Sequence, residues 1–278
     1  MSIEFVGNEY DRERILKPSR DVTFYTDRTC VREDSKLKIY FQYEPVAINQ
    51  TILKVPALWQ KFDAILTYNE DVLEQCPNAR LFHFQTETWL DKEDYLNVDT
   101  SQKQFLVSNH TGFKTMCKAH EFRHLVYVNQ KLFDPNFFIF FRSSAQPIIP
   151  AIANNPIIGK DLKDKIMLFK HFQFSLVIEN TRERHCYTEK LIDCLVTKTI
   201  PIYYGCSNVH EYFDTTGWIL IENESLEEIV EKCKVLHPNY YIQYKEVIEA
   251  NYQKALQGVD NYKCLNDVLA TIPGYANS

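Results

Sequence analysis

The stretch Phe174–Gly205 (FSLVIENTRERHCYTEKLIDCLVTKTIPIYYG) most constrains what this chain can fold into. Phe174–Glu179 is a nearly continuous apolar run, typical of a strand buried on both faces. A polar segment follows, then a predicted helix over Glu189–Lys198 and a second strand over Thr199–Tyr204. This order predicts a βαβ unit and therefore an α/β protein with a parallel sheet.

Polar side chains gather where the first strand of this unit ends and its helix begins. Asn180 follows the strand, Thr188 is a candidate N-cap, and Glu189 and Lys190 open the helix. Ligands of open α/β sheets bind at the carboxyl ends of strands, and helix N-termini favour phosphate. The junction is therefore a candidate nucleotide site.

The rest of the chain shows two sets of alternating strands and helices that divide near residue 100. We expect two Rossmann-like domains facing a cleft, with a small acceptor-side domain over 1–100 and a donor-binding domain with terminal helices over 101–278. Expected strands lie at 22–25, 36–43, 62–68, 80–84, 104–108 and 126–129, and expected helices at 52–62, 70–75, 113–126, 160–172, from Ser225 on, and over 240–272 with a break near Gly258. Residues 88–98 are expected to form a polar connector, and 134–155 show no clear pattern.

Charge and composition exclude several classes of protein. The net charge is −6, so no basic field exists to hold nucleic acid. Eight cysteines occur without a C-x-x-C pair or a metal-ligand spacing, and no signal peptide or membrane-spanning run is visible. We expect free thiols and a soluble, cytoplasmic protein.

Missing motifs narrow the chemistry. The chain has no G-x-G-x-x-G, P-loop, H-E-x-x-H or G-x-S-x-G, which argues against dinucleotide oxidoreductases and epimerases, P-loop NTPases, zincins and α/β-hydrolases. It also has no Asp-x-Asp with which to hold a metal on a diphosphate. If the chain binds a nucleotide diphosphate, Lys190, Arg182, Arg184 and the helix N-terminus are placed to neutralise it, with no metal and no cofactor.

The same residues resemble the donor-binding motif of the α-1,3-fucosyltransferases, glycosyltransferase family 10, most of all its bacterial members. The matching elements are Glu179-Asn180-Thr181, Thr188-Glu189-Lys190, Ile192-Asp193 and Thr199-Ile200-Pro201-Ile202, with Val107-Ser108-Asn109 at the start of the second domain. The resemblance covers roughly residues 103–240 and the first domain only loosely.

The resemblance implies a GT-B fold and a metal-independent reaction that inverts the anomeric centre. It places Asn180 in the donor site, Glu189 near the ribose or sugar hydroxyls, and Lys190 near the diphosphate. Relatives also carry a basic residue in the helix after the V-S-N strand, for which Lys114 and Lys118 are the nearest matches.

One departure from the family pattern concerns the nucleotide pocket. The aromatic expected six residues after the motif asparagine is Cys186 here, and the aromatic falls one place later, at Tyr187. The base and the sugar therefore stay open between GDP-fucose and a UDP-sugar such as UDP-xylose.

A general base must take the proton of the acceptor hydroxyl. Glu44 follows the predicted strand of the first domain and resembles the family's glutamate at that position; Glu70 and Glu87 are alternatives. The sequence thus predicts an enzyme that transfers a sugar from a nucleotide-sugar donor to a glycan hydroxyl. The other interpretation is a non-catalytic module that binds nucleotide-sugars or glycans.

Overall fold

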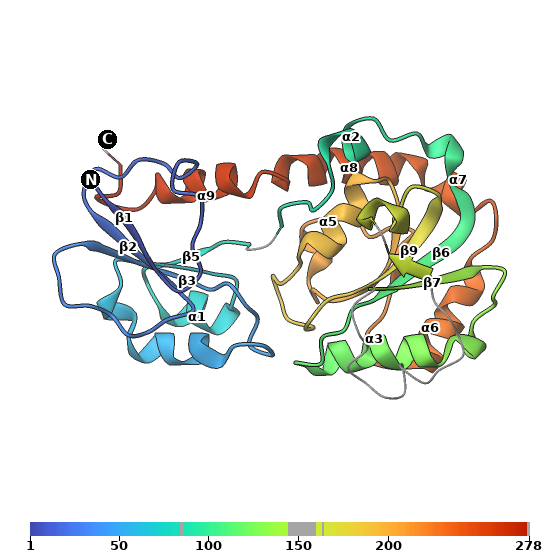
Figure 1. The fold of residues 1–278 in the computed structure, drawn as a ribbon, viewed down its shortest axis with the longest axis horizontal. Coiled ribbons are helices and arrows are strands. Elements are labelled where there is room, and N and C mark those ends of the chain that lie inside the picture. The colour runs from blue at the N-terminus through green and yellow to red at the C-terminus, as the bar shows by residue number, and fades with distance from the viewer. Residues whose placement is uncertain (84–85, 144–159, 163, 277–278) are drawn as a thin grey trace. The chain divides into compact units, whose positions relative to one another are not determined.

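The computed structural model describes residues 1–83, 86–143, 160–162 and 164–276, and only the backbone of Ser143 and of 160–162 (Figure 1). The chain divides into two compact units. Unit 1 contains Met1–Glu87, Glu183–Thr188 and Asp260–Ser278, and unit 2 contains Thr88–Arg182 and Glu189–Val259. Each unit is therefore built from separate stretches of the sequence.

Unit 1 is a sheet of five parallel strands in the sequential order β1-β2-β3-β4-β5. The strands are β1 (Ile3–Val6), β2 (Val22–Thr26), β3 (Leu37–Phe41), β4 (Ala64–Thr67) and β5 (Ala79–Leu81). Its helices are α1 (Glu70–Gln75) and α9 (Asn261–Leu269), with 3₁₀ helices at Gln50–Ala57 and Trp59–Lys61.

Alternate side chains of this sheet enter two separate apolar clusters, as the period of a strand requires. Phe24 and Ile39 pack with Leu265 and Leu269 of α9. Tyr25 and Tyr40 pack on the opposite face with residues of the 3₁₀ helix and α1, among them Ile52 and Val72. The C-terminal helix thus covers one face of a sheet that is built from the first residues of the chain (Figure 1).

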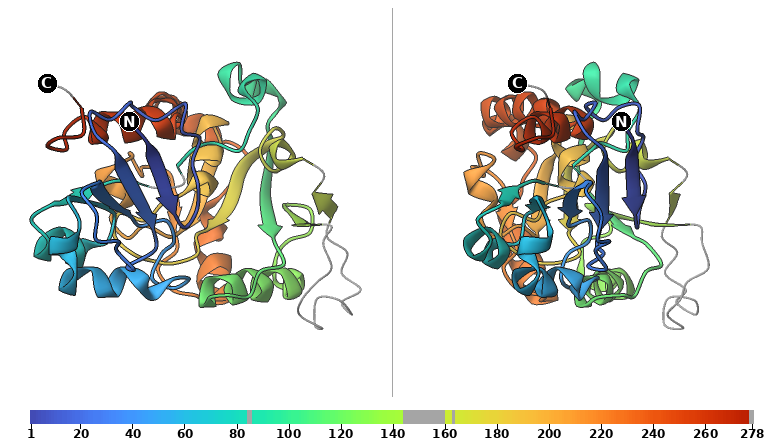
Figure 2. Two further views of the ribbon diagram at one scale, coloured as in Figure 1. Left: turned by 60° about the vertical axis from the view of Figure 1, so that its left-hand side comes forward. Right: turned by 90° about the vertical axis from the view of Figure 1, so that its left-hand side faces the viewer.

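Unit 2 holds six parallel strands in the order β11-β10-β9-β6-β7-β8. They are β6 (Gln104–Thr111), β7 (Phe138–Ser143), β8 (Lys160–Leu162), β9 (Phe172–Ile178), β10 (Ile200–Tyr204) and β11 (Ile219–Leu220). Read from β8 to β11, this is the 3-2-1-4-5-6 order of a Rossmann fold. The order reverses between β6 and β9, which are hydrogen-bonded neighbours at the centre of the sheet (Figures 1 and 2).

The helices of unit 2 are α2 (Lys92–Leu96), α3 (Lys118–Val128), α5 (Glu189–Val196), α6 (Leu226–Lys232), α7 (Tyr240–Gln243) and α8 (Lys245–Gly258). Single 3₁₀ turns lie at Thr100–Gln102, Gln130–Leu132, Lys165–Leu168, Val209–Glu211 and Cys233–Val235. α3 leads from β6 toward β7, and α5 connects β9 to β10. No helix within the described residues is long and apolar enough to cross a membrane.

Most predicted elements are confirmed, including the Ser225 cap, whose side chain accepts from the Glu228 amide. Two predictions are wrong. The strand expected at 126–129 is the end of α3, because Val126 and Tyr127 lie on the buried face of that helix. The helix expected at 160–172 is replaced by β8 and one 3₁₀ turn, because the chain must already be extended at Phe172 to begin β9.

Other differences are smaller. The expected connector 88–98 contains the short helix α2, and β7 lies in the stretch 134–155 that had no clear pattern. Phe84, at the end of the strand expected at 80–84, lies outside the described residues. Where the sequence suggested a division near residue 100, the units separate after Glu87, and α9 belongs to unit 1.

Candidate functional site

The carboxyl ends of β6 and β9 form the centre of the candidate donor site in unit 2. In a doubly wound sheet, the crevice outside the strands where the order reverses is the usual place for a ligand. Arg123 of α3 is bound there: its Nε donates to the Ile178 carbonyl at 2.9 Å and its Nη2 to Asn180 Oδ1 at 2.8 Å. The predicted donor residue Asn180 is therefore fixed by a half-buried guanidinium.

Arg123 was missed by the sequence reasoning, which named Lys114 and Lys118 as the nearest basic residues of this region. The signal was present, because Arg123 is also a basic residue in the helix after Val107-Ser108-Asn109. Sequence spacing did not show which turn of α3 would face β9.

Lys190, in the first turn of α5, lies among carboxylates. Its Nζ is 3.0 Å from Glu189 Oε1 and 3.4 Å from Glu179 Oε2. The Glu179 side chain is fully buried and that of Lys190 is 25% exposed. Burial by itself lowers the pKa of Lys190, but Glu189 and Glu179 outweigh it and raise the pKa above its ordinary value. Lys190 therefore carries a stable positive charge at the helix start.

A glycine allows this arrangement. Gly205 follows β10, and a Cβ placed there would lie 2.5 Å from Glu179 Cγ and 2.5 Å from the Tyr203 hydroxyl oxygen. Such distances are far inside van der Waals contact. Position 205 therefore has no room for a side chain while Glu179 keeps its place beside Lys190.

Two histidines at this edge are held neutral. Burial, followed by the charges of Arg123, Lys165 and Lys190, lowers the pKa of His110 to about 4. Burial, followed by Arg123 and Lys114, also lowers the pKa of His120 to about 4. His120 accepts the Met116 amide at Nδ1, and its ring interacts with the Asn180 side chain. Arg123 and Lys190 therefore lie close enough to both rings to lower their pKa values further.

The other predicted donor residues of unit 2 are more exposed. Arg182 follows β9 and lies near enough to Tyr204 to oppose the rise of that phenol's pKa, which burial drives. Lys114 is exposed in the loop between β6 and α3. Asp193, from the same motif, is buried. It accepts hydrogen bonds from Thr88 Oγ1 at 2.5 Å and from the Trp89 amide at 3.1 Å, and it forms an ion pair with Lys165 Nζ at 2.5 Å.

The middle of the motif, Glu183–Thr188, belongs to unit 1. Cys186 is buried in the apolar cluster that includes Leu265 and Leu269. Tyr187 stacks on His83, with ring centroids 4.7 Å apart, and His83 Nδ1 is 2.8 Å from the His185 carbonyl oxygen. The departure from the family pattern is therefore visible in the structure. Cys186 packs in the apolar core, and Tyr187, one residue later, stacks on His83.

Arg184 and Thr188 complete this segment. Arg184 Nε pairs with Glu70 Oε1 at 2.6 Å, so a predicted donor residue pairs with one of the two alternative bases. Thr188, the predicted N-cap, is buried next to the start of α5. The second alternative base, Glu87, lies 3.6 Å from an Arg14 nitrogen and is about half exposed.

Glu44, the predicted base, lies at the carboxyl edge of the unit 1 sheet and is half-buried. A second carboxylate, Asp27, holds its backbone: Oδ1 accepts the Tyr43 amide and Oδ2 the Glu44 amide, both at 3.0 Å. Asp27 has φ of 49° and is 4% exposed, and burial raises its pKa. Sequence reasoning missed Asp27, although it directly follows a strand.

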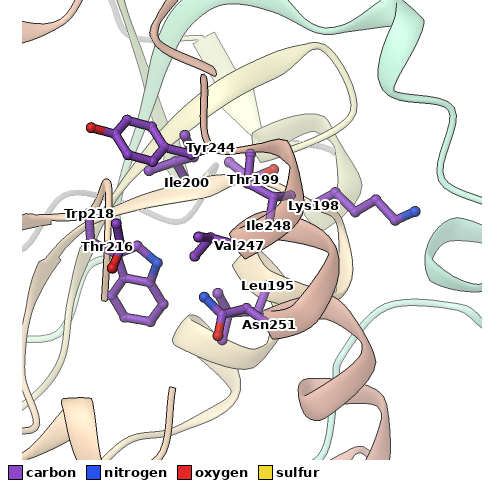
Figure 3. A pocket seen from close by; sticks show the side chains of 10 residues that line it. All are labelled: Leu195, Lys198, Thr199, Ile200, Thr216, Trp218, Tyr244, Val247, Ile248 and Asn251. Atoms are coloured by element: carbon purple, nitrogen blue, oxygen red, sulfur yellow. The ribbon is translucent and has the colours of Figure 1, made fainter. Parts of the chain in front are cut away.

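A small internal cavity of unit 2 lies away from these groups (Figure 3). Its volume is about 10 Å³, and its walls come from the end of α5, the start of β10 and α8, among them Leu195, Ile200 and Ile248. That volume holds about one water molecule, whereas ligand pockets measure ~300–1,000 Å³. Across the described residues, no group of three or more His, Cys, Asp and Glu side chains is arranged to hold a metal ion.

Sequence comparison finds relatives for less than half of the chain. The α-(1,3)-fucosyltransferase FucT of Helicobacter pylori is 27% identical over 124 residues, which is 44% of this chain and 26% of that protein. A putative fucosyltransferase-like protein of Arabidopsis thaliana is 30% identical over 109 residues, 38% of this chain and 20% of that protein. The matched segments therefore span about a quarter or less of these relatives. No protein-family model matches the chain.

Solved structures match over most of the chain and show its fold. TarM aligns with a TM-score of 0.60 at 12% identity, covering 91% of this chain and 54% of TarM. An S. aureus TarM mutant solved with UDP has a TM-score of 0.56 at 12% identity, covering 90% and 55%. An α1,3-fucosyltransferase solved with GDP-fucose has a TM-score of 0.50 at 15% identity, covering 89% and 78%. The chain has the GT-B fold, and its sequence is distantly but significantly similar to the α-1,3-fucosyltransferases.

Proposed function

We propose that the chain is a fucosyltransferase-like glycosyltransferase that takes its sugar from a nucleotide-sugar. The observation that carries the proposal is the cationic edge of unit 2, where Arg123, Asn180 and Lys190 meet at the point of strand-order reversal. The similarity to the Helicobacter pylori fucosyltransferase over 124 residues of the chain supports the assignment.

Binding of the donor follows from these charges. Lys190 and the N-terminus of α5 interact with the diphosphate, because cations and helix N-termini both favour phosphate. Asn180, Arg182 and Lys114 contribute polar and cationic contacts, and Glu189 accepts hydrogen bonds from ribose or sugar hydroxyls. Arg184, Tyr187 and Thr188 of the same motif are also assigned to donor binding.

The transfer inverts the anomeric centre in one displacement. The acceptor hydroxyl oxygen forms a bond to the anomeric carbon while the bond from that carbon to the diphosphate oxygen breaks. Glu44 takes the hydroxyl proton, and the nucleoside diphosphate leaves with the bonding electron pair. Charge on the leaving diphosphate is neutralised by Lys190 and Arg123, with no metal ion.

The donor is GDP-fucose or a UDP-sugar such as UDP-xylose. Structural neighbours were solved with GDP-fucose and with UDP, which supports both nucleotides as candidates. The aromatic at Tyr187, one place later than in the family pattern, is a reason not to assume the family's donor. The acceptor is a glycan hydroxyl.

A nucleotide titration tests the proposal. GDP and UDP are added to the protein in EDTA and, separately, with Mn²⁺, and the melting temperature is followed. A ligand that binds the folded state stabilises it by ~2.7 kcal/mol at a hundredfold excess over Kd. Lys190→Ala should abolish most of this gain, whereas Lys131→Ala, a change at an exposed lysine, should not.

Three outcomes contradict parts of the proposal. No response to either nucleotide would refute the donor site. Transfer activity that is lost in EDTA and restored by Mn²⁺ would refute the metal-free reaction. Nucleotide binding without transfer to any glycan would favour a binding module.

A further inference from the structure

His83 has no role in the reaction as described above, yet it makes two contacts to the segment Glu183–Thr188. Its Nδ1 lies 2.8 Å from the His185 carbonyl oxygen, and its ring stacks on Tyr187 at 4.7 Å with an interplanar angle of 30°. One side chain therefore holds both the backbone and the aromatic ring of this short segment.

The chemistry of the contact fixes the state of His83. A carbonyl oxygen only accepts hydrogen bonds, so Nδ1 must carry the proton and donate it. Burial keeps the ring neutral by lowering its pKa to about 4, so the neutral form with hydrogen on Nδ1 persists at physiological pH.

The backbone that His83 holds is unusual. His185 has φ of 60°, in the left-handed region that residues other than glycine rarely adopt. Such a conformation persists only where surrounding contacts determine it. The His83 hydrogen bond is one such contact, and the buried side chain of Cys186 next to it is another.

We propose that His83 is a positioning residue for nucleotide recognition: it fixes the left-handed turn at His185 and the ring of Tyr187, and thereby the backbone that leads directly into Glu189 and Lys190. The inference rests on the proposed function. The stacking contact gives a defined orientation to the ring of Tyr187, which the proposed function assigns to donor binding.

Separate variants remove each contact. His83→Phe keeps a ring for stacking but loses the donor. His83→Asn keeps an amide donor near the position of Nδ1 but loses the ring. His83→Ala loses both, and His210→Asn, at an exposed histidine, is the control. Dissociation constants for GDP and UDP and the melting temperature are measured on each full-length protein, together with donor KM and kcat where transfer is detected.

We expect His83→Phe and His83→Asn each to weaken nucleotide binding about 2- to 10-fold, and His83→Ala about 10- to 100-fold, from the usual worth of one hydrogen bond and one aromatic contact. Donor KM should rise by the same factor while kcat changes little, and the ratio of GDP to UDP affinity should shift. His210→Asn should match the wild type.

Two results are distinguishable. If the wild type binds nucleotide and the folded His83 variants bind equally well, His83 is only structural and the inference is overturned. If the wild type binds neither GDP nor UDP, the proposed function itself fails. Should His83→Ala not fold, the two single-contact variants still decide the question.

Discussion

The carboxyl edges of the two parallel sheets differ in charge. In unit 2 the edge at β6 and β9 has the cations Arg123 and Lys190 beside the carboxylates Glu179 and Glu189, and its histidines His110 and His120 are kept neutral. In unit 1 the edge at β2 and β3 has the carboxylates Asp27 and Glu44. Similar α/β frameworks therefore present a site for an anion in one unit and candidate proton acceptors in the other.

The buried phenols of unit 1 agree with this contrast. Burial raises the pKa of Tyr68, Cys186 and Glu183 raise it further, and the two carboxylates Asp27 and Glu44 add to the rise. The pKa of Tyr10 is raised by burial and, to a smaller extent, by the same two carboxylates. Strand order differs as well, because the sheet of unit 1 runs sequentially whereas that of unit 2 reverses between β6 and β9. Only the reversal creates the crevice in which α/β proteins usually bind nucleotides.

The strongest way to break the comparison is to remove the proposed base. Glu44→Gln preserves size and polarity but cannot accept the acceptor's proton. We expect kcat to fall ~10²–10⁴-fold, the usual contribution of general-base catalysis, with nucleotide affinity unchanged. Steady-state kinetics and a nucleotide titration measure both. A variant that turns over at the wild-type rate would exclude Glu44 and leave Asp27 or Glu70 to be tested.

Removing the guanidinium of Arg123 in unit 2 should weaken nucleotide binding. Arg123→Met leaves the Ile178 carbonyl and Asn180 Oδ1 without their donor. A hydrogen bond to a charged group is worth ~1.5–3 kcal/mol, so nucleotide affinity should fall about 10- to 100-fold. Calorimetric titration measures the loss, with Lys118→Met, an exposed position on the same helix, as the control. Equal losses in both variants would mean that net charge, not the placement of Arg123, controls binding.

A smaller effect is expected from the glycine behind Glu179. Gly205→Ala places a methyl group 2.5 Å from Glu179 Cγ and from the Tyr203 hydroxyl, and Glu179 is buried. Overpacking of this kind typically costs ~1–3 kcal/mol of unfolding free energy. Denaturant unfolding measures the cost, and Gly258→Ala, where nothing lies within 4 Å of the added carbon, is the matched control. An unchanged stability for Gly205→Ala would show that Glu179 can move away from Lys190 freely.

Local patterns predicted much of unit 2. The apolar run before Asn180 and the polar start of the next helix are properties of neighbouring residues, so the sequence predicted the strand, the loop and the helix. It also predicted Asn180, Glu189 and Lys190 as members of one site. It could not predict their surroundings. Arg123 reaches Asn180 only because one face of α3 packs toward β9, and that rotation depends on packing between elements remote in sequence.

The composition of unit 1 was beyond sequence patterns for the same reason. Nothing local to Leu265 or Leu269 indicates that α9 covers a sheet made of residues 3–81. Nor does the polar stretch Glu183–Thr188 indicate that Cys186 fills the core of that unit. Asp27 was overlooked because its role is to accept backbone amides of the next strand's end, a contact that only the parallel pairing of β2 and β3 creates.

A further prediction separates the two edges by their response to acid. The pKa values of His110 and His120 are about 4 in the folded chain and about 6.5 in an unfolded one, so the folded state binds fewer protons between these values. The stability that these neutral rings contribute is complete above pH ~6.5 and is lost as the pH falls toward 4, by up to about 1.4 kcal/mol per pH unit for each ring.

Asp27 has the opposite effect on stability. Because its folded pKa is raised, its ionisation costs stability as the pH rises through its unfolded value of 3.8. Urea unfolding of His110→Gln from pH 7 to 4 should therefore show a shallower decline than the wild type, whereas Asp27→Asn should not make the decline shallower. A wild-type slope in His110→Gln would mean that the pKa of this ring is the same in the folded and the unfolded chain, so that neither burial nor the nearby cations lower it.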